Sequence, residues 1–420
     1  MGLTCQPNKE DPMRRLAFLT ALLLVAAACA DDDGGGAGGG QEATDVCNED
    51  EFGCVEIPEG DPIVLGSLLA ISGENASLGQ DSQNGAVIAT DTRNNEVAGH
   101  PITWEHQDDL CAPEGGQTGA QALAANDQVA AVIGTTCSSA GEPASQILSE
   151  SGIVLISPSN TAPSLTDPET HQPFYLRTAH NDKIQGAAMG DFASSELGAT
   201  TAATIHDGSP YAEGLANVFA ENFQAAGGEV TAQEAVQVGD RDMRPVLTSI
   251  AADAPDLIYY PVFVAEGGAI TSQAREISDL SDTELAGADG MLNPDWISAS
   301  GERNAEGVYL SGPDLEFSGS FYEEEFLPAY QEEFGDTTSV FHAHAFDATN
   351  MVLDAIESVA ITEDGTTFIP RTALKDELFS TSGYEGIIGE LTCDENGDCN
   401  PEAAISVSVV ENGEFERIWP

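Results

Sequence analysis

The stretch DDLCAPEGGQTGAQALAANDQVAAVIGTTCSSAGEPASQILSESGIVLISPSNT (Asp108–Thr161) decides the fold of this chain. It contains two short apolar runs, VAAVIG (Val129–Gly134) and GIVLIS (Gly152–Ser157), and between them a segment that favours a helix over Ala140–Ser151. Apolar runs of this length, bounded by turn residues, are typical of strands that are buried on both faces of a parallel sheet. The stretch therefore predicts a strand–helix–strand unit of an α/β fold.

A polar turn follows each of these predicted strands. TTCSS (135–139) follows the first strand and PSNT (158–161) follows the second. In open α/β sheets ligands bind at the carboxyl ends of strands, and the start of the next helix offers free N–H groups to an anion. The sequence has no G-x-S-x-G motif, and no serine, histidine and acid at this point have the spacing of a nucleophile triad. The pattern favours a binding cleft and not an enzyme active site.

Strands and helices alternate from Asp61 onward in two series. The first series contains expected strands at 62–70 and 102–108 and expected helices at 78–95 and 117–126, in addition to the elements above. The second begins with a helix at 182–197. Such alternation predicts parallel sheets with right-handed crossovers, here in two lobes of similar build. At the end of the chain, 387–393 and 403–418 are expected to form a hairpin with a turn at Glu411-Asn412-Gly413.

The N-terminus is typical of an export signal. Arg14 and Arg15 precede the apolar run LAFLTALLLVAAAC, which is too short to span a bilayer. We expect residues 1–28 to be a lipoprotein signal peptide, with Met13 as a second candidate start and Cys29 as the lipidated residue. The alternative is ordinary secretion with an incidental Cys29. Residues 29–60 are expected to form a flexible acidic and glycine-rich linker.

The charge balance is strongly acidic. The chain has 13 basic and 71 acidic residues, and without the first 28 residues it has 10 basic and 69 acidic residues, a net charge of −59. Nucleic acid and anionic membrane surfaces attract positive proteins, so we exclude both as partners and leave the lipid anchor as the membrane contact. Acids scattered along the chain, with few lysines, suggest a habitat of high salt; the alternative is an acidic secreted protein of ordinary habitat.

Six cysteines remain once Cys5 and Cys29 are set aside. An even number in an exported chain predicts disulfides, and six cysteines allow fifteen connectivities. We expect near neighbours to pair, with Cys47–Cys54 closing a small loop and Cys393–Cys399 pinching a hairpin that has an Asn-Gly turn. Zinc is disfavoured, because the spacings C-x5-C and C-x6-C lack the usual closer pairing and no histidines lie nearby.

The stretch quoted first, together with FYLRTAHND (174–182), IHDGSPYAEGLA (205–216), DLIYYPVF (256–263) and GADG (287–290), resembles the periplasmic leucine/isoleucine/valine-binding proteins of ABC importers, within the type I solute-binding superfamily. The resemblance implies a two-lobed fold with a hinge of three crossings, and it supports a Cys111–Cys137 disulfide. The implied lobes are 61–181 with 312–402, and 182–311 with 403–420.

The same resemblance implies a site for an α-amino acid. Ser138 and Thr161 would donate to the ligand carboxylate, helped by the backbone at the helix start near Ser139, while the Ser159 carbonyl and Asp289 would take the ammonium group. The alternative for each hydroxyl residue is a helix cap or a turn.

Three positions depart from the family pattern, and a fourth keeps two interpretations. Tyr211 matches a family tyrosine, but Phe263 stands where a tyrosine is usual, Leu78 replaces a frequent aromatic residue, and Asp289 is shorter than the usual acid. Asp182 would influence either the closure of the lobes or the position of the ligand; the alternative is that it is the N-cap of a helix. These departures are compatible with leucine, isoleucine or valine, with another small zwitterion, or with an amide.

We therefore expect an extracytoplasmic, lipid-anchored solute-binding protein, not an enzyme, that captures a branched-chain amino acid and delivers it to an ABC permease. The alternatives are capture of urea, short amides or another nitrogen compound, and a sensor that reports its ligand to a membrane receptor. No cofactor or metal is expected. His342 and His344 lie two residues apart and so point to different faces of a helix, which prevents joint chelation.

Overall fold

The computed structural model describes residues 42–317 and 319–420. The expected signal peptide, the expected lipidation of Cys29 and the first part of the expected linker lie outside the described residues. Within the described ranges, no helix combines the length and the apolar character that crossing a membrane would require.

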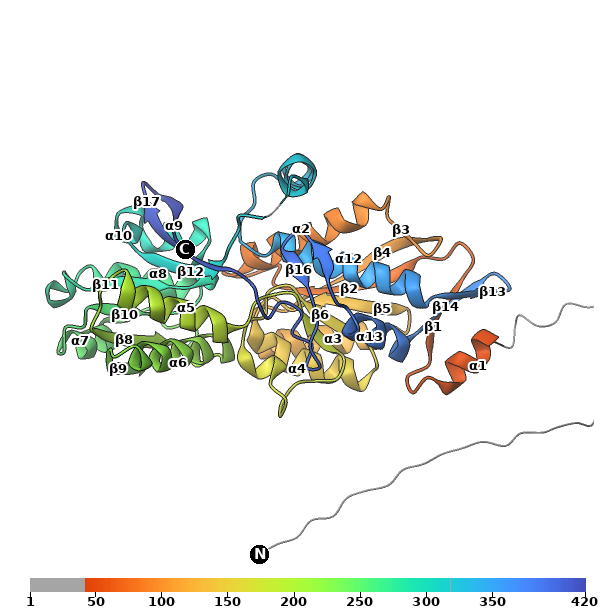
Figure 1. The fold of residues 1–420 in the computed structure, drawn as a ribbon, viewed down its shortest axis with the longest axis horizontal. Coiled ribbons are helices and arrows are strands. Elements are labelled where there is room, and N and C mark those ends of the chain that lie inside the picture. Colours follow the sequence, from red (N-terminus) through yellow and green to blue (C-terminus); the bar gives the residue numbers. More distant parts are fainter. Residues whose placement is uncertain (1–41, 318) are drawn as a thin grey trace, which may run out of the picture. The chain divides into compact units, whose positions relative to one another are not determined.

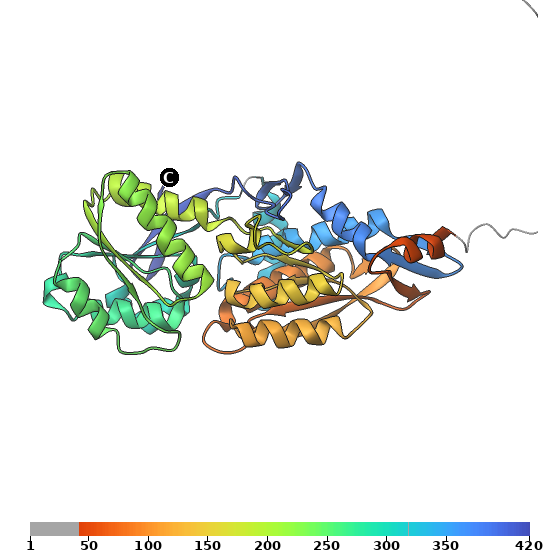
Figure 2. The same cartoon turned by 90° about the horizontal axis from the view of Figure 1, so that it is seen from below.

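The first lobe is built on a six-stranded sheet in the order β3-β4-β2-β5-β6-β7, with every pair parallel except β3 and β4. Its strands are coloured orange to yellow in Figure 1 and Figure 2. The bounds are β2 (Ile63–Leu69), β3 (Glu96–Val97), β4 (His100–Asp108), β5 (Val129–Gly134), β6 (Val154–Ser157) and β7 (Tyr175–Arg177), with helices α2 (Ala76–Thr92), α3 (Pro113–Ala124), α4 (Ser138–Glu150), α12 (His342–Val359) and α13 (Arg371–Phe379).

Strands β5 and β6 of this sheet are buried on both faces, as their apolar runs predicted. Ile133 and Ile156 pack in the core that includes α12, while Val132 and Leu155 pack in the core formed with α3 and α4. Because alternate residues of a strand point to opposite faces, both faces must be covered by helices. The strand–helix–strand unit inferred from the sequence is confirmed.

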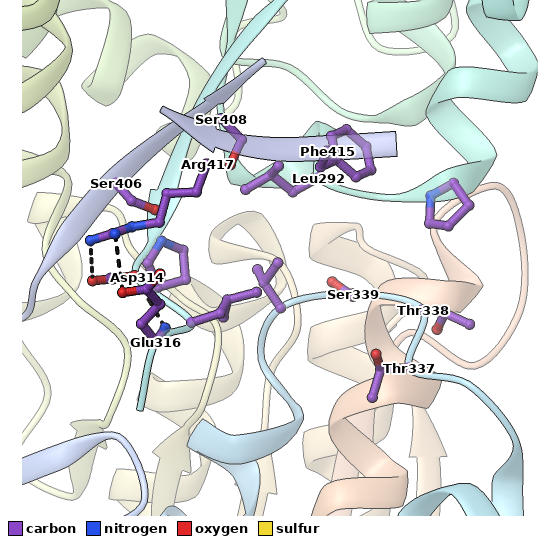
Figure 3. Close-up of a pocket in the computed structure, with 14 residues that line it drawn as sticks. Leu292, Asp314, Glu316, Thr337, Thr338, Ser339, Ser406, Ser408, Phe415 and Arg417 are labelled. Atoms are coloured by element: carbon purple, nitrogen blue, oxygen red, sulfur yellow. Dashed lines mark hydrogen bonds and ion pairs between the residues drawn. The ribbon is translucent and has the colours of Figure 1, made fainter. Parts of the chain in front are cut away.

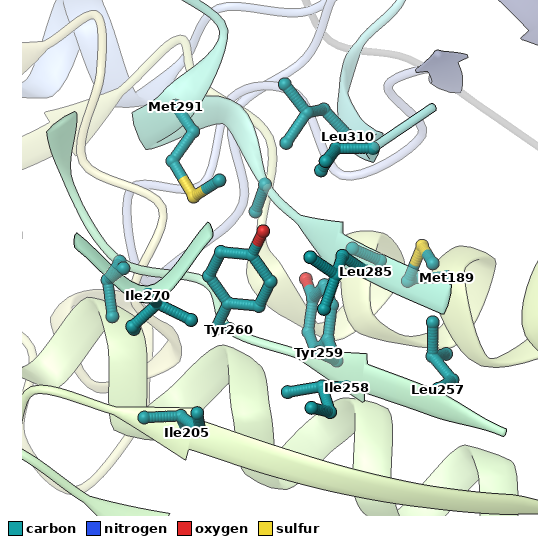
Figure 4. Packing of buried hydrophobic residues seen from close by; sticks show 14 of the residues in the cluster. Met189, Ile205, Leu257, Ile258, Tyr259, Tyr260, Ile270, Leu285, Met291 and Leu310 are labelled. Atoms are coloured by element: carbon teal, nitrogen blue, oxygen red, sulfur yellow. The ribbon is translucent and has the colours of Figure 1, made fainter. Parts of the chain in front are cut away.

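The second lobe is built on a seven-stranded sheet in the order β18-β17-β12-β11-β10-β8-β9, parallel from β9 to β12 and antiparallel at β17 and β18. Its core includes Ile258, Tyr260, Met291 and Leu310 (Figure 4). The bounds are β8 (Thr201–His206), β9 (Glu229–Ala235), β10 (Leu257–Tyr259), β11 (Glu284–Gly287), β12 (Tyr309–Pro313), β17 (Ile405–Glu411) and β18 (Glu414–Trp419), with helices α5 (Asp182–Ser195), α6 (Pro210–Ala225), α7 (Arg244–Ala251), α8 (Val264–Ala274), α9 (Pro294–Ser300) and α10 (Glu302–Ala305).

The chain passes between the two sheets three times, between β7 and α5, after β12 and before β17. A buried ion pair joins the first and third crossings, since Arg177 Nη2 lies 2.7 Å from Asp398 Oδ2. Asn181 also donates to this carboxylate, over 3.0 Å. The expected two-lobed α/β fold with a three-crossing hinge is therefore present.

The structure differs from the expected linker over 29–60. Residues 42–58 contain α1 (Glu42–Glu49) and β1 (Cys54–Pro58), and β1 pairs antiparallel with β14 (Thr366–Pro370), which also pairs with β13 (Ile361–Glu363). Val55 and Ile57 are buried at every second position of β1, a strand period that the polar composition of the segment concealed. The ordered lobe therefore begins earlier than the expected domain start at Asp61.

The expected terminal hairpin is also corrected. Residues 389–391 form β16, which pairs with β15 (Tyr384–Gly386), so the terminal hairpin consists of β17 and β18 alone, joined at Asn412 and Gly413. A π-helical turn at Tyr322–Phe326 continues as α11 (Leu327–Phe334). All three expected disulfides are formed: Cys47–Cys54, Cys111–Cys137 and Cys393–Cys399.

Candidate ligand-binding site

Six of the residues singled out in the sequence meet around one small cavity between the strand ends of the two lobes. They are Leu78, Ser138, Ser159, Tyr211, Phe263 and Asp289, joined there by Thr136, Cys137, Gly290 and Phe341. The cavity measures about 10 Å³, which is room for a single water molecule. An amino acid would enter only if the lobes parted.

The first-lobe wall of the cavity consists of hydroxyl groups and the start of a helix. Ser138 Oγ accepts a hydrogen bond of 3.3 Å from the Ala162 N–H, so its own proton remains free to donate. Ser159 Oγ donates to the Thr136 carbonyl over 2.9 Å. Cys137 caps α4 without a side-chain hydrogen bond to any described residue, which leaves N–H groups of the first turn for an anion.

A buried carboxylate supports this wall from behind. Asp109 accepts hydrogen bonds from the backbone N–H of Thr136 (2.6 Å) and of Cys111 (2.7 Å). Burial raises the pKa of Asp109 to about 7, although these backbone hydrogen bonds act in the opposite direction. The Cys111–Cys137 disulfide closes the same turn. The wall is therefore held by covalent and hydrogen-bonded contacts before any ligand arrives.

The second-lobe wall carries a carboxylate and two aromatic rings. Asp289 Oδ1 accepts hydrogen bonds from Tyr211 Oη (3.0 Å) and Gln185 Nε2 (2.8 Å). Burial raises the pKa of Asp289, while the proximity of His180 and the two hydrogen bonds lower it. The rings of Tyr211 and Phe263 lie with centroids 5.1 Å apart. This wall therefore offers a negative charge next to an apolar surface.

Three of the predicted site residues do not line the cavity. Ser139 turns its hydroxyl to the Cys111 carbonyl, 3.3 Å away, and Thr161 is buried with its carbonyl accepting from the Asp182 N–H (3.0 Å). Asp182 opens α5, but the cap is Asn181, whose side chain accepts from the Lys183 N–H (3.0 Å). The helix-cap alternative for Asp182 is therefore wrong.

Several lining residues were not singled out in the sequence. Thr136 and Cys137 belong to the turn that was recognised, and Gly290 belongs to the GADG motif. A Cβ at Gly290 would lie 2.9 Å from the Val262 carbonyl oxygen, so a larger residue would displace backbone. No sequence motif marks Phe341 as a site residue. It lies at the end of the second hinge crossing, which returns the chain to the first lobe, and this crossing brings it to the cavity.

Two polar contacts join the lobes outside the lining of the cavity. Asn293 Nδ2 donates to Ser77 Oγ over 2.7 Å, and the Arg241 guanidinium pairs with both carboxylate oxygens of Glu74. A separate, larger groove lies at the hinge, where Arg417 pairs with Asp314 and Glu316 (Figure 3). It is removed from the polar strand-end turns, and we assign the candidate ligand site to the smaller cavity.

Two α/β lobes joined by a three-crossing hinge, with a polar cavity at the strand ends between them, define a two-lobed solute-binding protein. The family model described as "Periplasmic binding protein" matches residues 62–414, and the chain belongs to this family. The family places it outside the cytoplasm and among binding proteins, not enzymes.

Known proteins similar to this chain extend over most of its length. The leucine-, isoleucine-, valine-, threonine- and alanine-binding protein of Pseudomonas aeruginosa is 26% identical over 80% of this chain and 87% of its own. The structure of a leucine-binding protein, LivK, from Thermotoga maritima has a TM-score of 0.76 at 26% identity, covering 85% of this chain and 97% of its own. The structure of LivJ from Streptococcus pneumoniae, solved with isoleucine, has a TM-score of 0.74 at 26% identity, covering 86% of this chain and 100% of its own.

Proposed function

We propose that the protein captures a small amino acid, of the branched-chain class, and delivers it to the membrane permease of an ABC importer. The observation that carries this proposal is the opposite character of the two walls of one cavity. Ser138 and the start of α4 offer hydrogen-bond donors, and Asp289 offers a buried negative charge. A zwitterion presents the complementary pair of groups.

The ligand would lie across the cavity. Its carboxylate would accept from Ser138 Oγ and from backbone N–H groups at the start of α4, and its ammonium would face Asp289. Its side chain would pack on Leu78, Phe263 and Phe341, which are apolar and line the cavity. The ligands of the similar proteins described above, leucine and isoleucine among them, support this class.

Hinge closure would couple ligand binding to delivery. Because the cavity holds about one water molecule in this arrangement, an amino acid would enter an open form and be enclosed as the lobes approach. A ligand that contacts both walls binds the closed form better and shifts the population toward it. A permease could then distinguish the loaded form by its surface.

The N-terminal sequence supports an anchored location for this activity. Residues 1–28 have the pattern of a signal peptide that ends at Cys29, and the glycine-rich segment after it would let the lobes stand away from the membrane. We propose lipidation of Cys29 and function in a medium of high salt, the latter from the net charge of −59 without the first 28 residues.

A second candidate ligand is urea or a short amide. Phe263 and Leu78 present no hydroxyl, Asp289 has a short side chain, and the cavity is small. An uncharged amide could donate its N–H groups to Asp289 without bringing a full positive charge.

The test is thermal unfolding of the exported chain from residue 30, with each of the twenty amino acids, urea and short amides, at low and molar salt. A ligand that binds the folded state raises the unfolding midpoint by mass action. We expect the branched aliphatic amino acids to give the largest rise and the Asp289→Ala variant to remove it. A rise with an amide and with no amino acid would instead favour the second candidate.

A further inference from the structure

A second group of polar side chains lies buried beside the ligand cavity. His180, Asp182 and Asp289 each place one potential ligand atom within 4.8 Å of those of the other two. All three side chains are buried, with at most 4% exposure. His180 and Asp182 lie at the first hinge crossing and Asp289 follows β11 of the second lobe. Asp182 and Asp289 were expected near the ligand from the sequence, but His180 was not, because the hinge brings the three residues together.

The hydrogen bonds of Gln185 determine which ring nitrogen of His180 carries the proton. Gln185 Nε2 donates to Asp289 Oδ1 (2.8 Å) and to the Ser311 carbonyl (3.0 Å), so Gln185 Oε1 is the atom that faces His180 Nε2. Nε2 must then carry the proton, and in the neutral ring Nδ1 carries a lone pair. Burial lowers the pKa of His180, which favours the neutral ring. Nδ1 is buried and has no hydrogen-bond partner among the described residues.

Asp182 is the second unpartnered group. Both of its carboxylate oxygens are buried and accept no hydrogen bond of normal geometry from any described residue, although the Thr161 hydroxyl is close enough to affect its pKa. The nearby Arg177 guanidinium binds Asp398, Thr166 and the Ala162 carbonyl through its two terminal nitrogens, while its Nε has no partner among the described residues. A buried carboxyl group without a hydrogen-bond partner stays neutral by keeping its proton, unless a cation takes the place of that proton.

We propose that a divalent transition-metal cation binds between the His180 imidazole and the carboxylates of Asp182 and Asp289. All three groups are Lewis bases once Asp182 has released its proton, and binding of the cation would drive that release. One imidazole nitrogen with two carboxylates suits Zn²⁺ or Mn²⁺ better than Ca²⁺ or Mg²⁺, which take oxygen ligands. The site stands on these contacts and does not require the proposed amino acid ligand.

One consequence does rest on the proposed function. The ligand ammonium would approach Asp289 from the cavity, while the metal would approach it from the side of Asp182. Because the two cations would share one carboxylate, each should weaken the binding of the other, and by linkage the two factors must be equal.

The experiment is a titration of the untagged exported chain with Mn²⁺, followed by electron paramagnetic resonance of free Mn²⁺, and with Zn²⁺, followed by calorimetry. Excess Mg²⁺ is present to occupy the acidic surface. We expect one saturable site per chain, with affinity lowered at least about tenfold in Asp182→Asn and in His180→Gln. The matched controls His206→Gln and Asp167→Asn, which change residues outside the group, should keep the site.

The cation proposal is overturned if no saturable site remains in excess Mg²⁺, or if both Asp182→Asn and His180→Gln bind Mn²⁺ and Zn²⁺ as the unaltered chain does. Circular dichroism establishes that each variant is folded. Because two independent variants are used, the test still gives a result if one of them does not fold. Leucine binding is measured on the same samples. Leucine binding without metal binding would overturn the cation site alone, and metal binding without any amino acid ligand would overturn the proposed function alone.

Discussion

The two walls of the cavity reach a similar degree of burial by different means. The first-lobe wall is neutral, and its hydroxyls and helix start are fixed by backbone hydrogen bonds, by Asp109 and by a disulfide. The second-lobe wall carries a charge, Asp289, held by the side chains of Tyr211 and Gln185. The first wall is thus built into the strand ends, whereas the second depends on long side chains from separate elements.

This difference indicates which wall should contribute more to ligand affinity and which should orient the ligand. A wall of neutral hydrogen-bond donors loses little free energy when an open form exposes it to water, because water replaces its hydrogen bonds. A buried carboxylate is stabilised only when a cation or donors approach it. We therefore expect the second wall to contribute more to affinity and the first wall to orient the ligand.

The largest expected effect is that of Asp289→Asn. Removing one partner of a buried charge pair costs about 2–5 kcal/mol, so leucine affinity should fall by roughly 30-fold or more. Calorimetry with two leucine analogues sharpens the comparison. 4-Methylpentanoate, which lacks the ammonium group, should not lose affinity in this variant, whereas 3-methylbutylamine, which lacks the carboxylate, should. Equal losses for both analogues would mean that Asp289 shapes the cavity and does not pair with the ammonium.

The first wall was more accessible to sequence reasoning than the second. Its residues lie in two turns directly after two apolar strands, so strand ends alone located the turns that contain Ser138 and Ser159, and the family resemblance implied the roles of these two residues. Tyr211, Phe263 and Asp289 were located through the family resemblance, and the cavity brings them together with the first-wall residues. His180 and Gln185, which contact or approach Asp289, were missed because their roles depend on the hinge and not on local sequence.

The fold shows the same division. Alternation of apolar runs and helical segments predicted both sheets, because burial on two faces leaves a continuous apolar run. It did not predict β1, a short strand of alternating pattern in a polar segment, whose pairing with β14 joins residues more than three hundred positions apart. Ser139 was expected in the site because it marks the helix start whose backbone would help to bind the carboxylate, but its side chain turns to the Cys111 carbonyl and does not line the cavity.

The pH dependence of stability tests how the first wall is supported. The pKa of Asp109 is raised from 3.8 to about 7 in the folded state, so the folded chain holds a proton that the unfolded chain releases. This contribution to stability is complete below about pH 4 and is lost as the pH rises through about 7. Between about pH 5 and 8 the free energy of unfolding should fall by about 2–3 kcal/mol on account of Asp109.

Urea unfolding across this range checks the expectation with three variants. Asp109→Asn should remove this part of the decline, and Asp347→Asn should remove a similar part, because burial also raises the pKa of Asp347 to about 7. Asp127→Asn, at an exposed position, should leave the decline unchanged. A decline that persists in full in Asp109→Asn would show that the wall is not supported by a protonated carboxyl group.

Ser138→Ala should have a smaller effect on affinity than Asp289→Asn. A hydrogen bond to a charged group contributes about 1.5–3 kcal/mol, which is roughly a tenfold to hundredfold loss of leucine affinity. The loss should appear with 4-methylpentanoate and not with 3-methylbutylamine, the reverse of the Asp289 pattern. Ser139→Ala is the matched control, because the Ser139 hydroxyl turns to the Cys111 carbonyl. If the two serine variants lose equal affinity, the first wall does not act through the Ser138 hydroxyl.

The smallest expected effect lies where the two walls are joined. Arg241 pairs with Glu74 across the lobes, and both side chains are at least half exposed, so the pair should contribute only about 0.2–1 kcal/mol to the closed form. Arg241→Gln should therefore weaken leucine binding by roughly fivefold at most at low salt. In molar salt the unaltered chain should bind almost as the variant does, because the Debye length falls to about 3 Å.

Arg244→Gln is the matched control, since Arg244 pairs with Asp242 and Glu276 within the second lobe and should not affect closure. A salt-independent loss in Arg241→Gln would mean that Arg241 acts by packing and not by charge. A loss as large as that of Asp289→Asn would contradict the comparison itself, because closure would then depend more on the contact between the lobes than on the ligand held between their walls.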